Sequence, residues 1–277
     1  MSYKGKDYLE FSNKCLLCVS LLFKDIPILK RAYPVLLKLW AYLTWTGGYK
    51  IRNYKGSLFF LNFRNHVDRC IGLRGGFEHK QTDYLFSNGE KNGCDMFLDI
   101  GANIGLYTLN AAQTGFIKEI HSFEPDPRNY AQLQGNLYLN KLTDMVKVYK
   151  LGVSDKVGSL KFEMFPETST GRTRVLDDNE SEAVSGEIRE LSITTLDTLF
   201  DFKDRKILIK MDVEGHEKEA IKGGENLLRN NKCFMQVESW PGNVESLKEM
   251  LVPLGYSLVN RIDEDYYFTN FEVESVK

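Results

Sequence analysis

The sequence lacks any uncharged apolar stretch long enough to cross a bilayer as a helix. The longest such stretches, Cys15–Phe23 and Leu39–Tyr49, fall well short of the roughly 20 residues that a membrane-spanning helix needs. Glycine (22 residues) and proline (7) are not enriched and no internal repeat is visible, which excludes collagen-like, low-complexity and repeat architectures. With 43% hydrophobic and 27% charged residues, the composition is typical of a soluble globular protein.

Cysteines are few, odd in number and scattered, which argues against a disulfide framework. Cys15 and Cys18 form a CxxC pair, but no second pair completes a zinc site, and both lie in an apolar run. We therefore interpret them as core residues. No signal-peptide cleavage pattern follows the N-terminus, and together these features predict a cytoplasmic protein.

Acidic residues are nearly absent between Phe11 and Val67, where nine lysines and arginines face Asp25 alone. The first ten residues are neutral and the whole chain carries −2, so the rest carries a net charge of −10. A globally acidic catalytic half argues against a nucleic-acid partner. We assign residues 1–56 to a helical, basic-apolar extension and residues 57–277 to the main domain.

Two interpretations of the extension stay open. Basic residues interleaved with leucines and tryptophans are typical of amphipathic helices that lie at a membrane interface, here the inner face. Alternatively, the helices pack on the acidic domain or form a homodimer surface. Pro27 and Pro34, which interrupt any long helix, favour the second interpretation.

From Met96 onward, short apolar strands alternate with helical segments of ten to fifteen residues, the pattern of βαβ units. A hairpin turning near Gly158 and a long surface loop over Pro166–Glu190 interrupt this pattern. The expected strands are Ser57–Asn62, Met96–Ile100, Glu119–Glu124, Met145–Lys150, Lys206–Val213, Cys233–Glu238, Tyr256–Val259 and Tyr266–Thr269. The expected helices are Ile104–Thr114, Asp126–Asn140, Glu217–Arg229 and Asn243–Leu251. We predict a doubly wound α/β fold with a mostly parallel sheet and an antiparallel C-terminal strand.

The first strand-to-helix turn, DIGANIGLYTL, has the features of a cofactor site. Gly101 and Gly105 have no Cβ, so the backbone there can approach a ligand closely. Asp99, at the end of the strand, can accept a hydrogen bond from an ammonium group or order the turn.

A carboxylate at the end of the next strand, Glu124, can accept both hydroxyls of a ribose. It lies 23 residues after Gly101, about the interval of a βαβ unit, and Pro125 offers an apolar surface for an adenine. The nicotinamide fingerprint GxGxxG is not met, because Asn103 and Leu106 replace its second and third glycines. The turn therefore favours a ligand with a ribose and no phosphate.

Several ordered motifs resemble the FkbM family of methyltransferases. They are FLDIGANIGLYTL, SFEPDPRNYAQLQGNLYLN, VSDKVGSLKF and LIKMDVEGHEKEAIKGG, within a resemblance that runs from about Asp68 to Glu238. It implies a Rossmann-like class I methyltransferase fold, S-adenosylmethionine as methyl donor, and O-methylation of hydroxyls on sugars or other natural products.

Residue roles follow from the resemblance by position. It implies that Gly101, Asn103 and Gly105 line the methionine and ribose side, and that Glu124 holds the ribose. Ser154 and Asp155 would approach the adenine edge. A further family element, matched by Gly76, Phe77 and Glu78, would bring Glu78 to the amino-acid end of the cofactor; an exposed surface acid is the alternative for Glu78.

Two acids should meet beside the reacting methyl group. Asp212 and Glu238 end neighbouring strands, so they can accept the proton of the substrate hydroxyl or share a divalent cation. No third residue lies at a sequence spacing typical of a metal ligand, so we do not favour a metal. His216 is the best candidate for proton transfer near neutral pH, with an exposed helix-start residue as the alternative. For Glu214 and Glu217 we favour capping of that helix.

The leading hypothesis is thus an S-adenosylmethionine-dependent O-methyltransferase that acts on a sugar hydroxyl in a polysaccharide or glycolipid. A nicotinamide-dependent oxidoreductase and a non-catalytic cofactor-binding module of the same fold are the alternatives.

Overall fold

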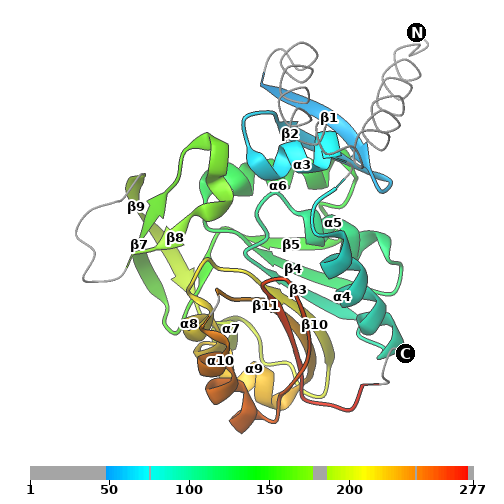
Figure 1. Ribbon diagram of the computed structural model, residues 1–277, viewed down its shortest axis with the longest axis vertical. Coiled ribbons are helices and arrows are strands. Elements are labelled where there is room, and N and C mark those ends of the chain that lie inside the picture. The colour runs from blue at the N-terminus through cyan, green and yellow to red at the C-terminus, as the bar shows by residue number, and fades with distance from the viewer. Residues whose placement is uncertain (1–47, 75, 177–185, 241, 274–277) are drawn as a thin grey trace, which may run out of the picture. The chain divides into compact units, whose positions relative to one another are not determined.

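The computed structural model describes residues 48–74, 76–176, 186–240 and 242–273 (Figure 1). The chain divides into two compact units, Met1–Phe77 and Glu78–Lys277. The predicted extension at residues 1–56 lies almost entirely outside the described residues. Its helices, its membrane or dimer contacts and the domain boundary at residue 56 therefore stay predictions. In the part of the chain that is described, no helix is both long and apolar enough to span a membrane.

The first unit contains a β-hairpin followed by a helix. Strands β1 (Tyr49–Tyr54) and β2 (Ser57–Asn62) pair antiparallel, and α3 (His66–Arg74) follows. The residues that connect the strands, Lys55 and Gly56, both have positive φ, as tight hairpin turns require. This confirms the strand predicted at Ser57–Asn62.

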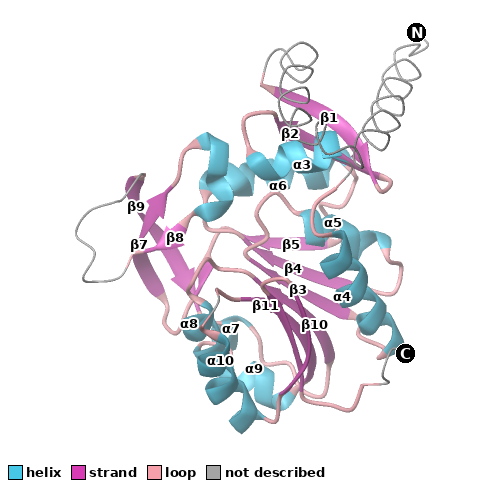
Figure 2. Cartoon of the chain, viewed as in Figure 1, coloured by secondary structure: helices cyan, strands magenta, loops and turns pink. Residues whose placement is uncertain are grey.

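The second unit is built on a seven-stranded, mostly parallel sheet (Figure 2). Its strands, in spatial order, are β12 (Ser257–Ile262), β13 (Asp265–Thr269), β11 (Lys232–Glu238), β10 (Lys206–Met211), β3 (Met96–Ile100), β4 (Glu119–Phe123) and β5 (Val146–Tyr149). Strand β13 is antiparallel to both of its neighbours, and the other pairs in this sheet are parallel. The predicted doubly wound α/β fold with an antiparallel C-terminal strand is confirmed.

Helices cover both faces of this sheet, which explains why strands such as β3 are buried along their whole length. The helices are α4 (His79–Lys91), α5 (Leu106–Gln113), α6 (Pro127–Leu139), α7 (Leu196–Leu199), α8 (Glu217–Lys222), α9 (Glu225–Asn230) and α10 (Val244–Leu251), with a short 3₁₀ turn η2 (Val252–Leu254). On one face, Phe86 of α4 packs edge-on against Phe97 of β3. On the other, Leu98 joins the core formed with Leu228 of α9 and Leu247 of α10.

A second, four-stranded sheet contradicts the predicted hairpin and the predicted loop. Its order is β6 (Gly152–Val153), β9 (Glu187–Thr194), β7 (Gly158–Met164) and β8 (Arg174–Val175). The hairpin near Gly158 is wrong, because β9 lies between β6 and β7 and pairs with both. The loop over Pro166–Glu190 is wrong in part, because it contains the 3₁₀ helix η1 (Glu167–Arg172), β8 and the start of β9.

The helix predicted over Glu217–Arg229 is two helices, α8 and α9, which meet at Gly223 and Gly224. A Cβ on Gly223 would lie 1.9 Å from the carbonyl oxygen of Ser154. Only glycine fits this approach of the chain, and glycine also weakens a helix at that point.

The chain reverses direction across the sheet between β3 and β10. From β3 it proceeds outward to β4 and β5, and from β10 it proceeds the other way to β11. In doubly wound sheets, ligands bind at such a switch point, outside the carboxyl ends of the strands.

Candidate functional site

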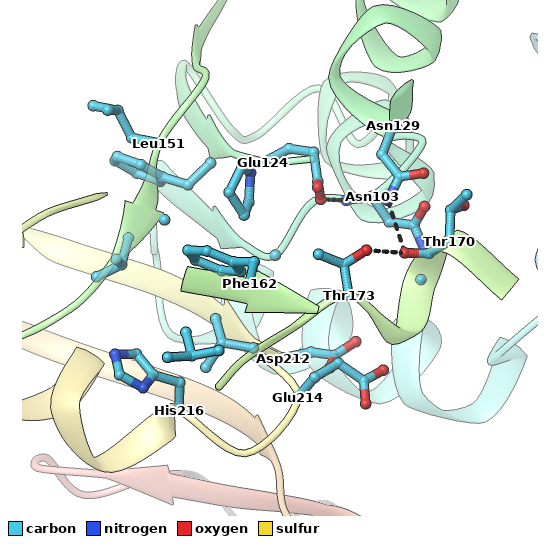
Figure 3. Close-up of a pocket in the computed structure, with 18 residues that line it drawn as sticks. Asn103, Glu124, Asn129, Leu151, Phe162, Thr170, Thr173, Asp212, Glu214 and His216 are labelled. Atoms are coloured by element: carbon cyan, nitrogen blue, oxygen red, sulfur yellow. Dashed lines mark hydrogen bonds between the residues drawn. The ribbon is translucent and has the colours of Figure 1, made fainter. Parts of the chain in front are cut away.

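A pocket with about 570 Å³ of empty space opens at this switch point (Figure 3). Of the residues predicted from the sequence, six line it: Gly101, Asn103, Glu124, Pro125, Asp212 and His216. The other lining residues are Phe123, Asn129, Leu151, Gly152, Val153, Phe162, Thr170, Gly171, Thr173, Val175, Val213 and Glu214. The remaining predicted residues, which do not line it, are Glu78, Asp99, Gly105, Ser154, Asp155 and Glu238.

The glycines of the first turn serve contacts within the protein. Gly101 has φ 83°, and a Cβ there would lie 1.8 Å from the carbonyl oxygen of Asp212. Gly105 has φ 89°, and a Cβ there would lie 2.4 Å from a methyl of Leu133 on α6. Glycine at these positions therefore lets the turn lie against β10 on one side and α6 on the other.

Glu124 is held rigidly by backbone groups at the end of β4. Its Oε2 accepts a hydrogen bond from the N–H of Asn103 at 2.7 Å, and its Oε1 accepts one from the N–H of Asp126 at 2.9 Å. Burial raises the pKa of Glu124 to about 8, although both N–H groups act in the opposite direction. The side chain of Asn129 is a third hydrogen-bond donor to Glu124, which leaves about one of the four acceptor positions of the carboxylate for a ligand. Beside it, the buried Oδ1 of Asn103 has no partner among the described residues.

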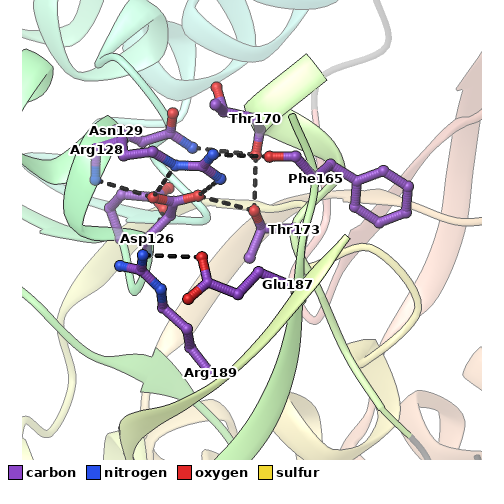
Figure 4. A network of polar contacts seen from close by, with 9 residues as sticks. Asp126, Arg128, Asn129, Phe165, Thr170, Thr173, Glu187 and Arg189 are labelled. Atoms are coloured by element: carbon purple, nitrogen blue, oxygen red, sulfur yellow. Dashed lines mark hydrogen bonds and ion pairs between the residues drawn. The ribbon is translucent and has the colours of Figure 1, made fainter. Parts of the chain in front are cut away.

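Part of the second sheet covers the pocket, and sequence reasoning missed this. Thr170, Gly171 and Thr173 come from η1 and the residue before β8, within the stretch expected to be a loop. The start of α6 fastens them (Figure 4): Thr173 Oγ1 donates to Asp126 Oδ2 at 2.8 Å, and Asn129 Nδ2 donates to the carbonyl of Thr170 at 3.3 Å. The serine- and threonine-rich composition of this stretch gives no sign of that role.

Arg128 adds a second tie between α6 and this cover. Its guanidinium donates to both carboxylate oxygens of Asp126 and, at 2.7 Å, to the carbonyl of Phe165 (Figure 4). Because Asp126 is fully buried, this bidentate pair is less screened than a surface ion pair.

At the opposite end of the pocket, Asp212 follows β10 beside a buried lysine. Lys210 Nζ donates to Asp212 Oδ2 at 3.1 Å and to the carbonyl of Gly101 at 3.0 Å. Burial alone would lower the pKa of Lys210, but the surrounding carboxylates, Asp212 foremost, raise it above its ordinary value. The lysine is therefore charged and neutralises part of the acidity around it.

Glu238, at the end of β11, shares a hydrogen bond with Asp212. The charge of Asp212, together with burial, raises the pKa of Glu238 to about 10. Two carboxyl groups can share a hydrogen bond only when one of them keeps its proton, and here Glu238 is the protonated partner. The expected meeting of Asp212 and Glu238 at the edge of the sheet is thus observed.

A buried network lies behind this pair. The hydroxyl of Tyr107 bonds to Glu78 and accepts the N–H of Gln236 at 2.8 Å, and Gln236 also donates to Asp265 at 2.8 Å. Burial raises the pKa of Glu78 to about 7 and that of Asp265 to about 6. Glu78 thus lies among the acids around Lys210, and the short sequence element that contains it gives no hint of Tyr107, Gln236 or Asp265.

The remaining candidates have partners of their own. His216 lines the pocket, but its Nε2 lies 2.9 Å from Ser154 Oγ and its Nδ1 lies 3.5 Å from Glu219. Asp155 accepts from Lys222 at 2.7 Å. The fully buried Asp99 accepts from Thr108 at 2.5 Å.

Glu214 and Glu217, both interpreted as helix caps, differ in the structure. Glu217 Oε1 accepts the N–H of Gly215 at 3.0 Å and, more weakly, that of Val213 at 3.4 Å. Glu214 instead lines the pocket next to Asp212 and has a left-handed backbone with φ 52°. Both acids lie near the start of α8 in the sequence, and only the turn geometry separates them.

The ionisable side chains of the pocket lining are mostly acidic. Glu124, Asp212, Glu214 and His216 line the pocket, whereas no lysine or arginine of the described chain does. Among the described residues, no group of three or more histidine, cysteine, aspartate and glutamate side chains is arranged to hold a metal ion. The lining suits a ligand that presents positive charge and hydroxyl groups, and it is unsuited to a pyrophosphate, which needs cations or amide donors.

Comparisons with known proteins agree with this geometry. The family model described as the methyltransferase FkbM domain matches residues 99–258. Methyltransferase sdnD of Sordaria araneosa is 28% identical over 203 residues, which cover 62% of this chain and 76% of that protein. Hexuronic acid methyltransferase AglP of Haloferax volcanii is 26% identical over 206 residues, which cover 72% of this chain and 78% of that protein.

Two further similarities extend the comparison. The 31-O-demethyl-FK506 methyltransferase FkbM of Streptomyces tacrolimicus is 25% identical over 251 residues, 80% of this chain and 89% of that protein. Among solved structures, Methyltransferase FkbM from Methylobacillus flagellatus KT matches with a TM-score of 0.46 and 17% identity, over 64% of this chain and 44% of that one.

Proposed function

Because this chain belongs to the FkbM family of methyltransferases, we propose that it is an S-adenosylmethionine-dependent O-methyltransferase whose acceptor is a sugar hydroxyl in a polysaccharide or glycolipid. That the chain is a methyltransferase follows from its family and from relatives that share that activity. The donor and the acceptor class are the proposed parts.

One observation carries the choice of donor: among the described residues, the lining of the pocket at the switch point has three carboxyl groups, one histidine and no lysine or arginine. S-Adenosylmethionine has a sulfonium, an ammonium and a ribose, and it has no phosphate. Nicotinamide cofactors would bring a pyrophosphate to the same place, where the described lining holds acidic side chains and no lysine or arginine. The lining therefore favours the methyl donor over the nicotinamide alternative.

The residues present fit this donor. We assign Glu124 and the unpartnered Oδ1 of Asn103 to the hydroxyls of the ribose. Pro125, Leu151 and Phe162, which supply apolar surface, would pack against the adenine. The roles assigned by position to Ser154, Asp155 and Glu78 are kept as predictions. When bound, S-adenosylmethionine supplies the methyl group on a positively charged sulfur that is a good leaving group.

The protein's own contribution is orientation and removal of a proton. Asp212 lines the pocket and accepts a hydrogen bond from the ammonium of Lys210, so it is placed to accept the proton of a hydroxyl. Glu238 already carries a proton and shares it with Asp212, which keeps the base oriented. His216 is the second candidate for proton transfer, acting together with Ser154.

Support for the acceptor class comes from the resemblance and from one relative, which is a hexuronic acid methyltransferase. A sugar hydroxyl is a weak acid, so it needs a base such as Asp212 close by. We also propose a cytoplasmic location, with the N-terminal residues either at the inner face of the membrane or packed on a second copy of the chain.

Binding and transfer can be tested separately. Calorimetry on the full chain should detect S-adenosylmethionine and no comparable binding of NAD; tight NAD binding without the methyl donor would overturn the cofactor assignment. Deuterated methyl donor incubated with neutral pyranosides, hexuronates and lipid-linked oligosaccharides should add a labelled methyl that mass spectrometry detects. Label on none of these, or on an amine, would overturn the acceptor class.

A further inference from the structure

Glu214 is held differently from the other two carboxylates of the pocket. Glu124 accepts two backbone N–H groups, and Asp212 accepts the ammonium of Lys210. The carboxylate of Glu214 has no hydrogen bond or ion pair with any of the described residues, although it lines the pocket beside Asp212 (Figure 3). A half-buried carboxyl without a partner costs free energy unless it is protonated or a ligand compensates it.

The charged groups that face Glu214 come from three elements. Asp212 after β10 and Glu217 of α8 are acidic, whereas Lys210 of β10 and Arg172 of η1 are basic. Burial and then the two acids raise the pKa of Glu214 to about 8, against the smaller opposing effect of the two bases. Without ligand, Glu214 is therefore mostly protonated at neutral pH.

We propose that Glu214 is the residue by which the pocket distinguishes the positively charged methyl donor from its neutral thioether product. Its carboxyl ionises when the donor is bound and keeps its proton when the product is bound. This inference rests on the proposed function, because it takes S-adenosylmethionine as the donor and S-adenosylhomocysteine as the product.

The donor and the product differ by one methyl group and by the positive charge on the sulfur. Both have the same adenine, ribose and amino-acid groups, so any protonation change at Glu124 occurs with both and cancels in the comparison. A positive charge near a carboxyl favours its ionised form, and a neutral thioether does not. Ionisation of Glu214 releases a proton, so affinity for the donor should rise with pH while affinity for the product changes less.

This arrangement would favour release of the product. Near neutral pH, the demethylated ligand leaves Glu214 without a positive charge to compensate it, and the carboxyl takes up a proton. The affinities for donor and product then differ most at pH values above the pKa of Glu214. There the carboxylate is already ionised, so donor binding spends no free energy on removing its proton.

Calorimetric titration of the full chain with S-adenosylmethionine and S-adenosylhomocysteine, in two buffers of different ionisation enthalpy, measures the protons released. Near pH 7 we expect close to one more proton released with the donor than with the product. The donor-to-product affinity ratio should rise by up to about tenfold per pH unit between about pH 6.5 and 7.5, and level off above about pH 9. Glu214→Gln, which has nearly the same shape, should abolish the proton difference and flatten the ratio.

Glu245→Gln on α10 is the matched control, since Glu245 is exposed, pairs only with Lys248 among the described residues and does not line the pocket. It should keep the full proton difference. Failure to bind S-adenosylmethionine overturns the proposed function itself. Binding of both ligands with equal proton release and a ratio independent of pH overturns the inference about Glu214 alone.

A proton difference that persists in Glu214→Gln also overturns the inference, because another carboxyl would then sense the charge. If the variant fails to fold, the wild-type ratio across the pH range decides: a flat ratio rejects the inference. If the ratio rises with pH, the carboxyl group responsible is identified from the ¹³C-carboxyl resonances of labelled wild-type protein. The resonance that shifts with the donor and not with the product must be that of a glutamate; a shift confined to aspartates rejects Glu214.

Discussion

The two ends of the pocket hold their acids in opposite ways. At one end, Glu124 is fixed by the backbone N–H groups of Asn103 and Asp126, which have no charge to gain or lose. At the other end, Asp212 is held by the side chains of Lys210 and Glu238, and Glu238 carries a proton of its own. The first arrangement gives a constant shape, whereas the second gives a group of acids that can exchange protons. In the proposed function, recognition of the cofactor falls to the first end and proton transfer to the second.

Removing the base should have the largest effect. Asp212→Asn keeps the shape but cannot accept a proton, so we expect turnover to fall by about 10²- to 10⁴-fold. Affinity for the methyl donor should stay within a few-fold, because Glu124 is untouched. Initial rates with an accepted sugar and calorimetry measure the two quantities. Unchanged turnover would remove Asp212 from the mechanism, and a parallel loss of donor affinity would erase the distinction between the two ends.

Gly101 joins the two ends, since its turn follows β3 and lies against the backbone of Asp212. Gly101→Ala places a Cβ 1.8 Å from the carbonyl oxygen of Asp212 at a positive φ, and we expect a loss of about 2–4 kcal/mol in the free energy of unfolding. Gly115→Ala is the control: its φ is also positive, at 77°, but nothing lies within 4 Å of the new Cβ. Denaturant unfolding should show a smaller loss of unfolding free energy for Gly115→Ala. Equal losses in the two variants would mean that the positive φ, and not the contact with Asp212, causes the loss.

Glu124→Ala tests the rigid end. Two backbone N–H groups and the ribose hydroxyls lose their acceptor, so affinity for S-adenosylmethionine should weaken by about 1–3 kcal/mol. At saturating donor, turnover should remain near that of the wild type, because Asp212 and Glu238 keep their contacts. A variant that binds the donor normally but turns over slowly would reverse the roles of the two ends. Thermal denaturation without ligand checks that the fold persists.

The smallest effect is expected at the cover of the pocket. Thr173→Val removes the hydrogen bond from Thr173 Oγ1 to Asp126 Oδ2, which should weaken donor affinity by about 0.5–1.5 kcal/mol. Thr195→Val is the matched control, because Thr195 caps α7 and does not line the pocket. It should lower stability with no change in donor affinity. Equal donor affinity in both variants would show that the cover does not depend on this bond.

Much of the rigid end was predictable from the sequence. The apolar strands before Gly101 and Glu124 and the glycines of the turn are local signals, and the carboxyl ends of neighbouring parallel strands always share an edge. The same rule predicted that Asp212 and Glu238 would meet. The cover was not predictable, because β8 has only two residues and most of β9 is exposed, with charged residues at Glu187, Arg189 and Glu190. The few buried residues of β9, among them Ile193, produce too weak an alternation of apolar and polar residues to predict a strand.

The sequence by itself determined the succession of the main strands along the chain, the glycine-containing turn after β3 and the identity of the acids at the ends of the strands, because each depends on neighbours along the chain. Only the tertiary structure decided which acids carry protons. That depends on burial and on the summed charge of groups far apart in sequence, such as Glu78, Lys210 and Asp265, which gather around Asp212 once the sheet has formed. It also decided that Glu214 lines the pocket and Glu217 does not: Glu214 lies in a turn where it and Gly215 both have positive φ.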